Sequence, residues 1–148
     1  MRESTSTVGQ ELELVRAYLN ILQMRMGPRL AFGITAPDDV LACAFPPMML
    51  LSLVENAIKH GLEPKPEGGK LTLKAEIVHG KLAVTVADTG LGFGRAATAG
   101  TGVGLANIRE RLQLLYGPKA SLTIAENPGG GTKVTLAVPY KPVEPSAA

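Results

Sequence analysis

The hydrophobic positions along the chain repeat with two different periods, and these periods predict the order of its elements. Apolar side chains recur at steps of three and four over residues 10–26, which is typical of an amphipathic helix that a following Gly-Pro pair ends. Residues 30–34 alternate between larger and smaller side chains, which predicts a half-buried strand. A second helix is predicted between the Pro-Pro pair at 46–47 and Gly61.

The second half of the chain predicts two hairpins separated by a third helix. Residues 71–77 and 82–86 alternate on either side of a His-Gly turn and form the first hairpin. Residues 105–115 have the helical period, and residues 122–138 contain two alternating runs joined by Asn-Pro-Gly-Gly. Helices placed between strand pairs predict an α+β fold, a two-layer sandwich with helices on one face of a mixed five-stranded sheet.

The composition is that of one globular unit without an obvious polyanionic partner. The chain has 148 residues, of which 45% are hydrophobic, so it is long enough for one domain with a real core. Its 15 basic and 13 acidic residues are not clustered, which predicts no contact with nucleic acid or with a membrane surface. No apolar stretch approaches the roughly 20 residues of a membrane span, and the single Cys43 suits a reducing compartment.

A polar stripe interrupts the apolar second helix within the segment LSLVENAIKHGLEP. Ser52, Glu55, Asn56, Lys59 and His60 share one side of this helix, and apolar residues line the other side. One interpretation is an ordinary solvated helix face. The other is a site for Mg²⁺ bridged to phosphates, because this ion keeps several waters and needs only one or two protein oxygens.

The segment VADTGLGFG places an acidic residue and glycines directly after a strand. Gly90 and Gly92 mark a place where the chain turns sharply or lets a ligand approach its backbone. A dinucleotide-binding loop is disfavoured because position 95 is Arg and the following residues are unpatterned, and no Walker A sequence occurs. A buried Asp88 carboxylate would need a hydrogen-bond donor, and an adenine amino group is one candidate. Guanine would instead present an acceptor oxygen to the carboxylate, which is unfavourable. The alternative interpretation is an Asp that caps a turn.

Glycines also precede the third helix. Gly100, Gly102 and Gly104 come directly before its apolar pattern, so free backbone N–H groups and the positive end of the helix dipole would face an anion there. The residues between Gly92 and Gly102 are small, which predicts either a short mobile lid or a plain loop.

Taken in order, the segments ENAIKHG, DTGLGFG, GTGVGL and GGGTKVTL resemble the N box, G1 box, G2 box and final Gly-Thr strand of the GHKL ATPases. That family includes sensor histidine kinases, DNA gyrase, Hsp90 and MutL, and residues 9–140 are similar to the LytS-type sensor histidine kinases. The resemblance implies a Bergerat fold. It also implies that residues 1–28 form the tail of a dimerisation and phosphoacceptor region, residues 29–140 the ATP-binding catalytic domain, and residues 141–148 a disordered tail.

The resemblance further implies roles for individual residues. Asn56 would bind Mg²⁺, and Glu55 would act catalytically by polarising the attacking nucleophile or a Mg²⁺-bound water. Lys59 and His60 would face the phosphates of ATP, and Asp88 would accept the adenine amino group. The other nucleotide-binding positions would shape the pocket: Gly90 and Gly92 at the base, Gly102, Gly104 and Leu105 at the phosphates, and Thr132 beside the adenine.

By this resemblance the chain is the ATP-binding catalytic domain of a two-component sensor histidine kinase, with ATP and Mg²⁺ as cofactors. It would transfer the γ-phosphoryl group of ATP to a histidine on a domain outside this sequence, for relay to a response regulator. His60 lies in the N box and His79 at a hairpin turn, so neither is the expected acceptor and no productive autophosphorylation is expected. The implied parent is a homodimer whose catalytic domain is cytoplasmic. The alternative function is a GHKL nucleotide-binding switch without kinase activity, whose lid controls a protein contact.

Overall fold

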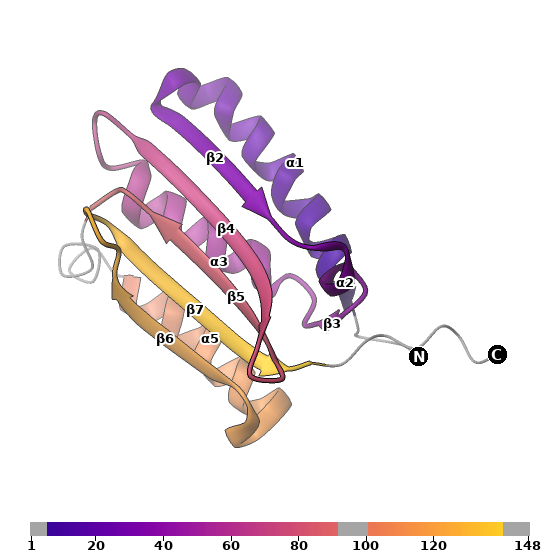
Figure 1. Ribbon diagram of the computed structural model, residues 1–148. Coiled ribbons are helices and arrows are strands. Elements are labelled where there is room, and N and C mark those ends of the chain that lie inside the picture. Colours follow the sequence, from indigo (N-terminus) through magenta and orange to yellow (C-terminus); the bar gives the residue numbers. More distant parts are fainter. Residues whose placement is uncertain (1–5, 92–100, 141–148) are drawn as a thin grey trace.

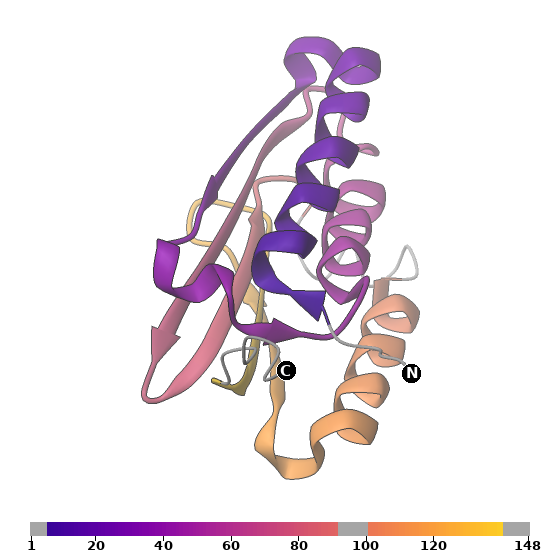
Figure 2. The ribbon, with the colours of Figure 1, turned by 90° about the vertical axis from the view of Figure 1, so that its right-hand side faces the viewer.

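A mixed five-stranded sheet with helices on one of its faces makes up the described part of the chain (Figures 1 and 2). The structure is a computed structural model that describes residues 6–91 and 101–140. In the strand order β2-β4-β5-β7-β6, β2 pairs with β4 in parallel and the other neighbours are antiparallel. The strands are β2 (Leu30–Thr35), β4 (Gly69–Val78), β5 (Lys81–Asp88), β6 (Ser121–Glu126) and β7 (Thr132–Pro139). The predicted fold class is therefore confirmed.

The long helices α1 (Val8–Met26), α3 (Met49–Ala57) and α5 (Thr101–Tyr116) lie on the same side of this sheet (Figure 2). The structure adds elements that are too short to show a period in the sequence. They include the helical turn α2 (Asp38–Leu41), where we predicted only a turn, the 3₁₀ turns η1 (Gly27–Arg29) and η3 (Gly117–Lys119), and the antiparallel pair β1 (Ser6–Thr7) and β3 (Ala44–Phe45). Within residues 6–91 and 101–140, no helix has the length and apolar character that crossing a membrane requires.

Helix α1 has clear local start and stop signals. The Thr7 hydroxyl accepts the N–H of Gln10, and the Gln10 side chain accepts the N–H of Thr7, so both residues form a capping box. The helix ends at Gly27, whose φ of 60° is easily adopted by glycine. The apolar stripe predicted from the sequence is buried against α3 and β2: Leu12, Val15, Leu19, Leu22 and Met26.

We expect Leu19→Ala to lower the free energy of unfolding by about 2–5 kcal/mol, because it leaves a cavity in the core. The Leu19 side chain is 0% exposed between α1 and the rest of the core. Ile21 on the same helix is 65% exposed, so Ile21→Ala is a matched control with an expected change within about 0.5 kcal/mol. Urea unfolding of both variants measures the difference, and equal effects would contradict the packing of α1 into this core.

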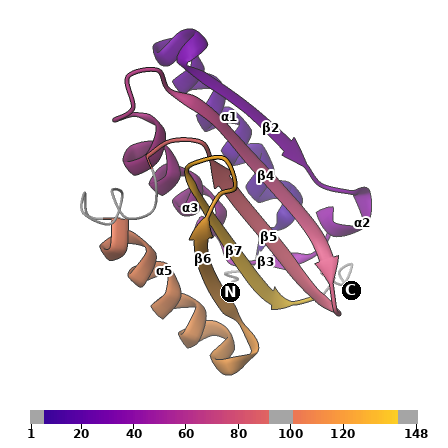
Figure 3. The same ribbon diagram turned by 60° about the vertical axis from the view of Figure 1, so that its left-hand side comes forward.

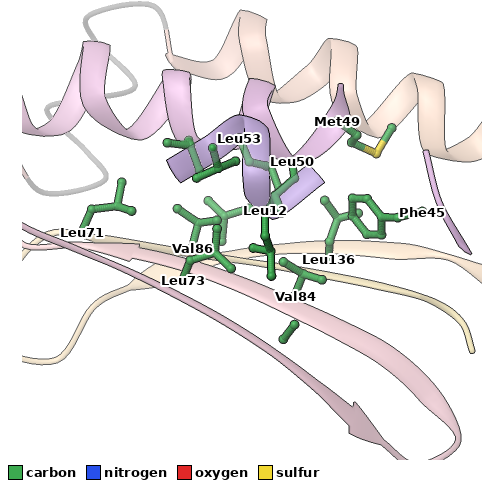
Figure 4. Close-up of a cluster of buried hydrophobic side chains, with 14 of the residues drawn as sticks. Leu12, Phe45, Met49, Leu50, Leu53, Leu71, Leu73, Val84, Val86 and Leu136 are labelled. Carbon is green, nitrogen blue, oxygen red and sulfur yellow. The ribbon is translucent and has the colours of Figure 1, made fainter. Parts of the chain in front are cut away.

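The core lies between the helices and the sheet (Figure 4). Leu50 and Leu53 of α3 extend toward the sheet, where they meet Leu73 and Val86 of the first hairpin. Alternation along these strands is maintained because the hairpin turn at His79 and Gly80 has positive φ at both positions, which matches the twist of the strands. This register buries every second side chain of β5 as far as its last residue, Asp88.

Candidate functional site

The C-terminal end of α3 continues into a π-helical turn, η2 (Ile58–Leu62). The N–H of Glu63 donates to the carbonyl of Ile58, five residues earlier, at 2.8 Å. Such single wide turns often occur at functional sites, and here the turn brings the backbone of Gly61 against the end of β5. The N–H of Leu91 donates to the Gly61 carbonyl at 2.9 Å, and this hydrogen bond joins η2 to the residues that follow β5.

Asp88 is buried at this junction, with 3% of its surface exposed. Its Oδ1 accepts the N–H of Gly90 at 2.8 Å, and its main-chain carbonyl accepts the side-chain amide of Asn127 at 2.9 Å. A Cβ atom at Gly61 would lie 2.8 Å from Oδ1 and 3.1 Å from Oδ2. The absence of a side chain at Gly61 is therefore what leaves room for the Asp88 carboxylate.

Burial disfavours the charged form of the Asp88 carboxyl group, and neighbouring N–H groups and a positive charge oppose this effect in part. Burial raises the pKa of the Asp88 carboxyl above its ordinary value. The N–H groups of Gly90 and Thr132 and the positive charge of Lys65 act in the opposite direction and lower that pKa. The carboxylate consequently has acceptor capacity that its own backbone neighbours satisfy only in part.

A narrow pocket opens in front of Asp88, between η2 and the ends of β5 and β7. Its walls are apolar, with Leu53 and Ala57 on the helix side and Val86 and Val134 on the sheet side. Thr132 is buried in the same pocket, and among the described residues its hydroxyl has no hydrogen-bond partner. Two apolar faces with a carboxylate and an unsatisfied hydroxyl between them suit a flat heterocycle that carries an amino group.

A second pocket adjoins the first one and lies between the polar stripe of α3 and the beginning of α5. Asn56 and His60 line both pockets, so the two pockets adjoin, and we refer to them together as the cleft. Figure 3 shows that the start of α5 and the end of α3 lie at the same end of the helical layer. The second pocket is lined by Ser52, Glu55, Asn56, Lys59 and His60 from one side and by Gly104, Asn107 and Ile108 from the other.

Asn56 faces the first turns of α5 at close range. A Cβ atom at Gly104 would lie 2.7 Å from Oδ1 of Asn56, so glycine is required for the amide to occupy this position. Unpaired N–H groups and the positive end of the helix dipole make the beginning of a helix favourable for anions. This end of the cleft therefore combines an amide oxygen, the cationic Lys59 and a helix start, which together suit phosphate groups and a divalent cation.

Comparison with known proteins identifies the family. Residues 47–142 match the model of the histidine kinase-, DNA gyrase B- and HSP90-like ATPases. The chain belongs to this ATPase family. It is an ATP-binding domain, and the cleft between α3 and α5 lies within the matched region.

Individual relatives of this ATPase domain are sensor kinases. It is 35% identical over 144 residues to the sensor histidine kinase YesM of Bacillus subtilis and 30% identical over 151 residues to the sensor protein LytS of Staphylococcus epidermidis. Both alignments cover 95% of this chain but only 25% of the relative, so the chain spans about a quarter of their length. The nucleotide-free catalytic domain of histidine kinase ThkA is similar in fold, with a TM-score of 0.73 at 17% identity over 96% of this chain and 100% of that domain.

The structure brings most of the predicted site residues of the ATPase domain to the cleft. Glu55 and Lys59 are exposed at the second pocket with the half-buried Asn56 and His60, and Asp88 and Thr132 lie in the first pocket. Gly104 contacts Asn56, as described above, whereas the adjacent Leu105 is buried in the core. Gly102 lies in the first turn of α5. Gly92 and the predicted lid over 92–100 lie outside the described residues.

Two glycines have structural roles that the sequence did not indicate. A Cβ at Gly90 would collide with the carbonyl of Gly61, so glycine there permits contact between two backbones, and its expected role beside the base stays a prediction. Gly61 was interpreted only as a helix stop, although it accommodates the Asp88 carboxylate. Asn107 and Asn127 were also missed, because a single Asn in a helix or turn carries no signal until the fold shows what lies opposite.

Proposed function

We propose that this ATPase domain is the catalytic domain of a two-component sensor histidine kinase. It transfers the γ-phosphoryl group of ATP to a histidine on another domain of its parent protein, for relay to a response regulator. The observation that carries the proposal is the pair of adjoining pockets, with a buried carboxylate in the first and an amide, a cation and a helix start around the second. These two ends match the base and the phosphates of ATP.

At the base end, the Asp88 carboxylate accepts the 6-amino group of adenine, and the Thr132 hydroxyl supports the ring through water. The apolar faces of the pocket stack on the base, since Val86 and Val134 lie on the sheet side of it. Guanine presents a carbonyl oxygen where adenine has its amino group, and a carboxylate facing that oxygen is repulsive. Selectivity for adenine therefore follows from one buried acceptor.

At the phosphate end, Asn56 would hold Mg²⁺ through its amide oxygen, which is the kind of ligand that this ion prefers. When bound, Mg²⁺ would neutralise the negative charge that develops on the γ-phosphoryl group during transfer. Lys59 and His60 face the phosphates, and Gly104 allows Asn56 to approach the start of α5. Glu55, which is exposed beside Asn56, polarises the attacking nucleophile.

We further propose the division of the chain that the resemblance implies. Residues 1–28 are the tail of the dimerisation and phosphoacceptor region, and residues 29–140 are the catalytic domain. In this arrangement α1 packs on the catalytic domain. It also links this domain to the rest of a homodimeric, cytoplasmic kinase region. Dimerisation would then place the histidine of one subunit within reach of a catalytic domain.

Calorimetric titration of the 148-residue chain with ATP, ADP and GTP, each with and without Mg²⁺, tests the nucleotide site. We expect ATP to bind with Mg²⁺ dependence and to bind more tightly than GTP. Equal affinity for ATP and GTP, or no dependence on Mg²⁺, would contradict the assignment of the two ends of the cleft.

Transfer itself is tested by adding the phosphoacceptor domain of the parent kinase and γ-labelled ATP. We expect acid-labile label on a histidine of that domain, and loss of this label with Glu55→Gln while ATP binding is retained. Binding of ATP without any transfer would instead favour a nucleotide-dependent switch.

A further inference from the structure

A groove separate from the ATP cleft lies between the beginning of α1 and the end of α5. We call it the α1–α5 groove; it is also lined by the segment 44–48, which contains β3 and leads into α3. Its volume of about 770 Å³ is within the range of known binding sites, roughly 300–1,000 Å³. None of the described residues that line it lines either pocket of the ATP cleft. The groove is therefore a distinct feature of this chain.

Glu11 of α1 is a buried acid in the wall of this groove. It is 1% exposed, and its Oε2 accepts the N–H of Met48 at 3.1 Å. Its Oε1 has no hydrogen-bond partner among the described residues. Buried polar atoms are normally paired, because an acceptor without a donor forfeits the hydrogen bonds that it would make with water. The unpartnered Oε1 therefore indicates a donor that this part of the chain does not supply.

The cation that lines the groove is not this donor. Arg111 of α5 donates instead to the carbonyl of Pro47 at 2.6 Å. Within residues 6–91 and 101–140, no ion pair includes Glu11. A lysine ammonium or an arginine guanidinium would give Oε1 both a donor and an opposite charge, and such charge-assisted hydrogen bonds are stronger than neutral ones. The expected ligand group is thus a basic side chain.

The rim of the groove is apolar. Leu14, Met48 and Leu115 line it and expose 44%, 50% and 54% of their surface. Through Leu115 and Tyr116, which line both, the groove adjoins a second hollow of about 420 Å³ that reaches Pro139 at the end of β7. Large apolar side chains grouped at one place on a surface are typical of a protein contact. An elongated apolar surface with one buried acid suits a polypeptide segment better than a small cation.

We propose that the α1–α5 groove is a docking site for an apolar segment of a partner protein, whose lysine or arginine side chain pairs with Oε1 of Glu11. The apolar neighbours of that basic residue pack on Leu14 and Leu115 at the rim. Because Met48 directly precedes α3, the docked segment contacts the beginning of the helix whose other end lines the ATP cleft. The inference does not depend on the proposed transfer reaction.

Three ligands of defined chemistry test this proposal in NMR titrations of the 148-residue chain. The first is an acetylated and amidated Leu-Lys-Leu tripeptide, the second is its Leu-Gln-Leu counterpart, and the third is n-butylammonium, which is the lysine side chain alone. We expect the lysine peptide to shift the amide signal of Met48 and to bind roughly tenfold more tightly than the glutamine peptide, since it alone forms a charged hydrogen bond to Glu11. It should also bind more tightly than n-butylammonium, which lacks the apolar flanks.

Matched variants locate the binding. Glu11→Gln keeps an acceptor for the N–H of Met48 but removes the charge, so it should equalise the affinities for the two peptides, whereas Glu13→Gln removes an exposed carboxylate of the same helix and should keep the difference. Leu115→Ala should weaken both peptides, and Leu114→Ala, at an 83% exposed position outside the groove, should change neither. Thermal melting identifies a variant that does not fold, and the peptide pair tests the charge in the parent chain without any substitution.

Three outcomes would overturn the proposal. Equal affinity of the parent chain for the two peptides refutes the pairing with Glu11, and equal affinity for the lysine peptide and n-butylammonium refutes a protein partner in favour of a small cation. Arg2 and Lys141 are basic residues near the two ends of the chain, outside the described residues. If Arg2→Gln or Lys141→Gln tightens the binding of the lysine peptide, an end of the chain itself occupies the groove, and docking of a partner is refuted.

Discussion

Replacing Asn56 with alanine is expected to abolish the Mg²⁺-dependent part of ATP binding and to leave the fold intact. The amide oxygen of Asn56 lies at the start of α5, in the position that Gly104 keeps open, and alanine removes this oxygen without filling its place. An interaction with a charged group is worth about 1.5–3 kcal/mol, so the loss amounts to roughly tenfold or more in affinity. Calorimetric titration with ATP in the presence and absence of Mg²⁺ measures it.

Asn20→Ala is the matched control for this prediction, because Asn20 is an exposed amide on α1 that lines neither pocket. We expect it to retain the gain in affinity that Mg²⁺ provides. The unfolding free energy of Asn56→Ala should change little, since Asn56 is only half-buried. An Asn56→Ala variant that still binds ATP more tightly with Mg²⁺ would exclude Asn56 as the metal ligand.

Asp88→Ala is expected to lower the ratio of the affinities for ATP and GTP by roughly tenfold or more, because the buried acceptor for the 6-amino group is lost. Asp88→Asn keeps the shape of the side chain but removes its charge, so it should weaken the preference in the same direction. Competition binding of the two nucleotides measures both variants. Asp39→Ala, which removes an exposed carboxylate on α2, is the control that should keep the preference.

The same carboxylate makes stability depend on pH in a defined direction. The pKa of Asp88 is higher in the folded chain than in the unfolded chain, because burial disfavours its charged form. In the pH range between the two values the folded chain binds more protons, so the free energy of unfolding decreases as the pH rises through that range. Asp88→Asn should remove this contribution, and thermal melting at several pH values detects the change. A larger decrease in Asp88→Asn than in the parent chain would contradict the burial of a titrating carboxyl group at this position.

Periodic patterns in the sequence were sufficient for the long elements and for the general position of the site. The apolar stripe of α1, the alternation in β4 and β5 and the polar stripe that begins at Ser52 each follow from the spacing of nearby residues, so local sequence specifies them. The order of the four glycine-rich and polar motifs was likewise sufficient to indicate the ATPase family, which the family match then confirmed. Elements of two to four residues, such as α2 and β3, have no period and were missed.

The tertiary structure alone decided how the motifs meet. Gly61 accommodates the carboxylate of Asp88, and Gly104 accommodates the amide of Asn56, although each pair lies far apart along the chain. Arg29 reaches carbonyls 34 to 37 residues away and thereby fixes Lys65 beside the end of β5. Local sequence determines which side of a helix or strand is polar, because that depends on spacing within the element. Which two polar sides face each other depends on the packing of the whole core, because many long-range contacts together determine where each element lies.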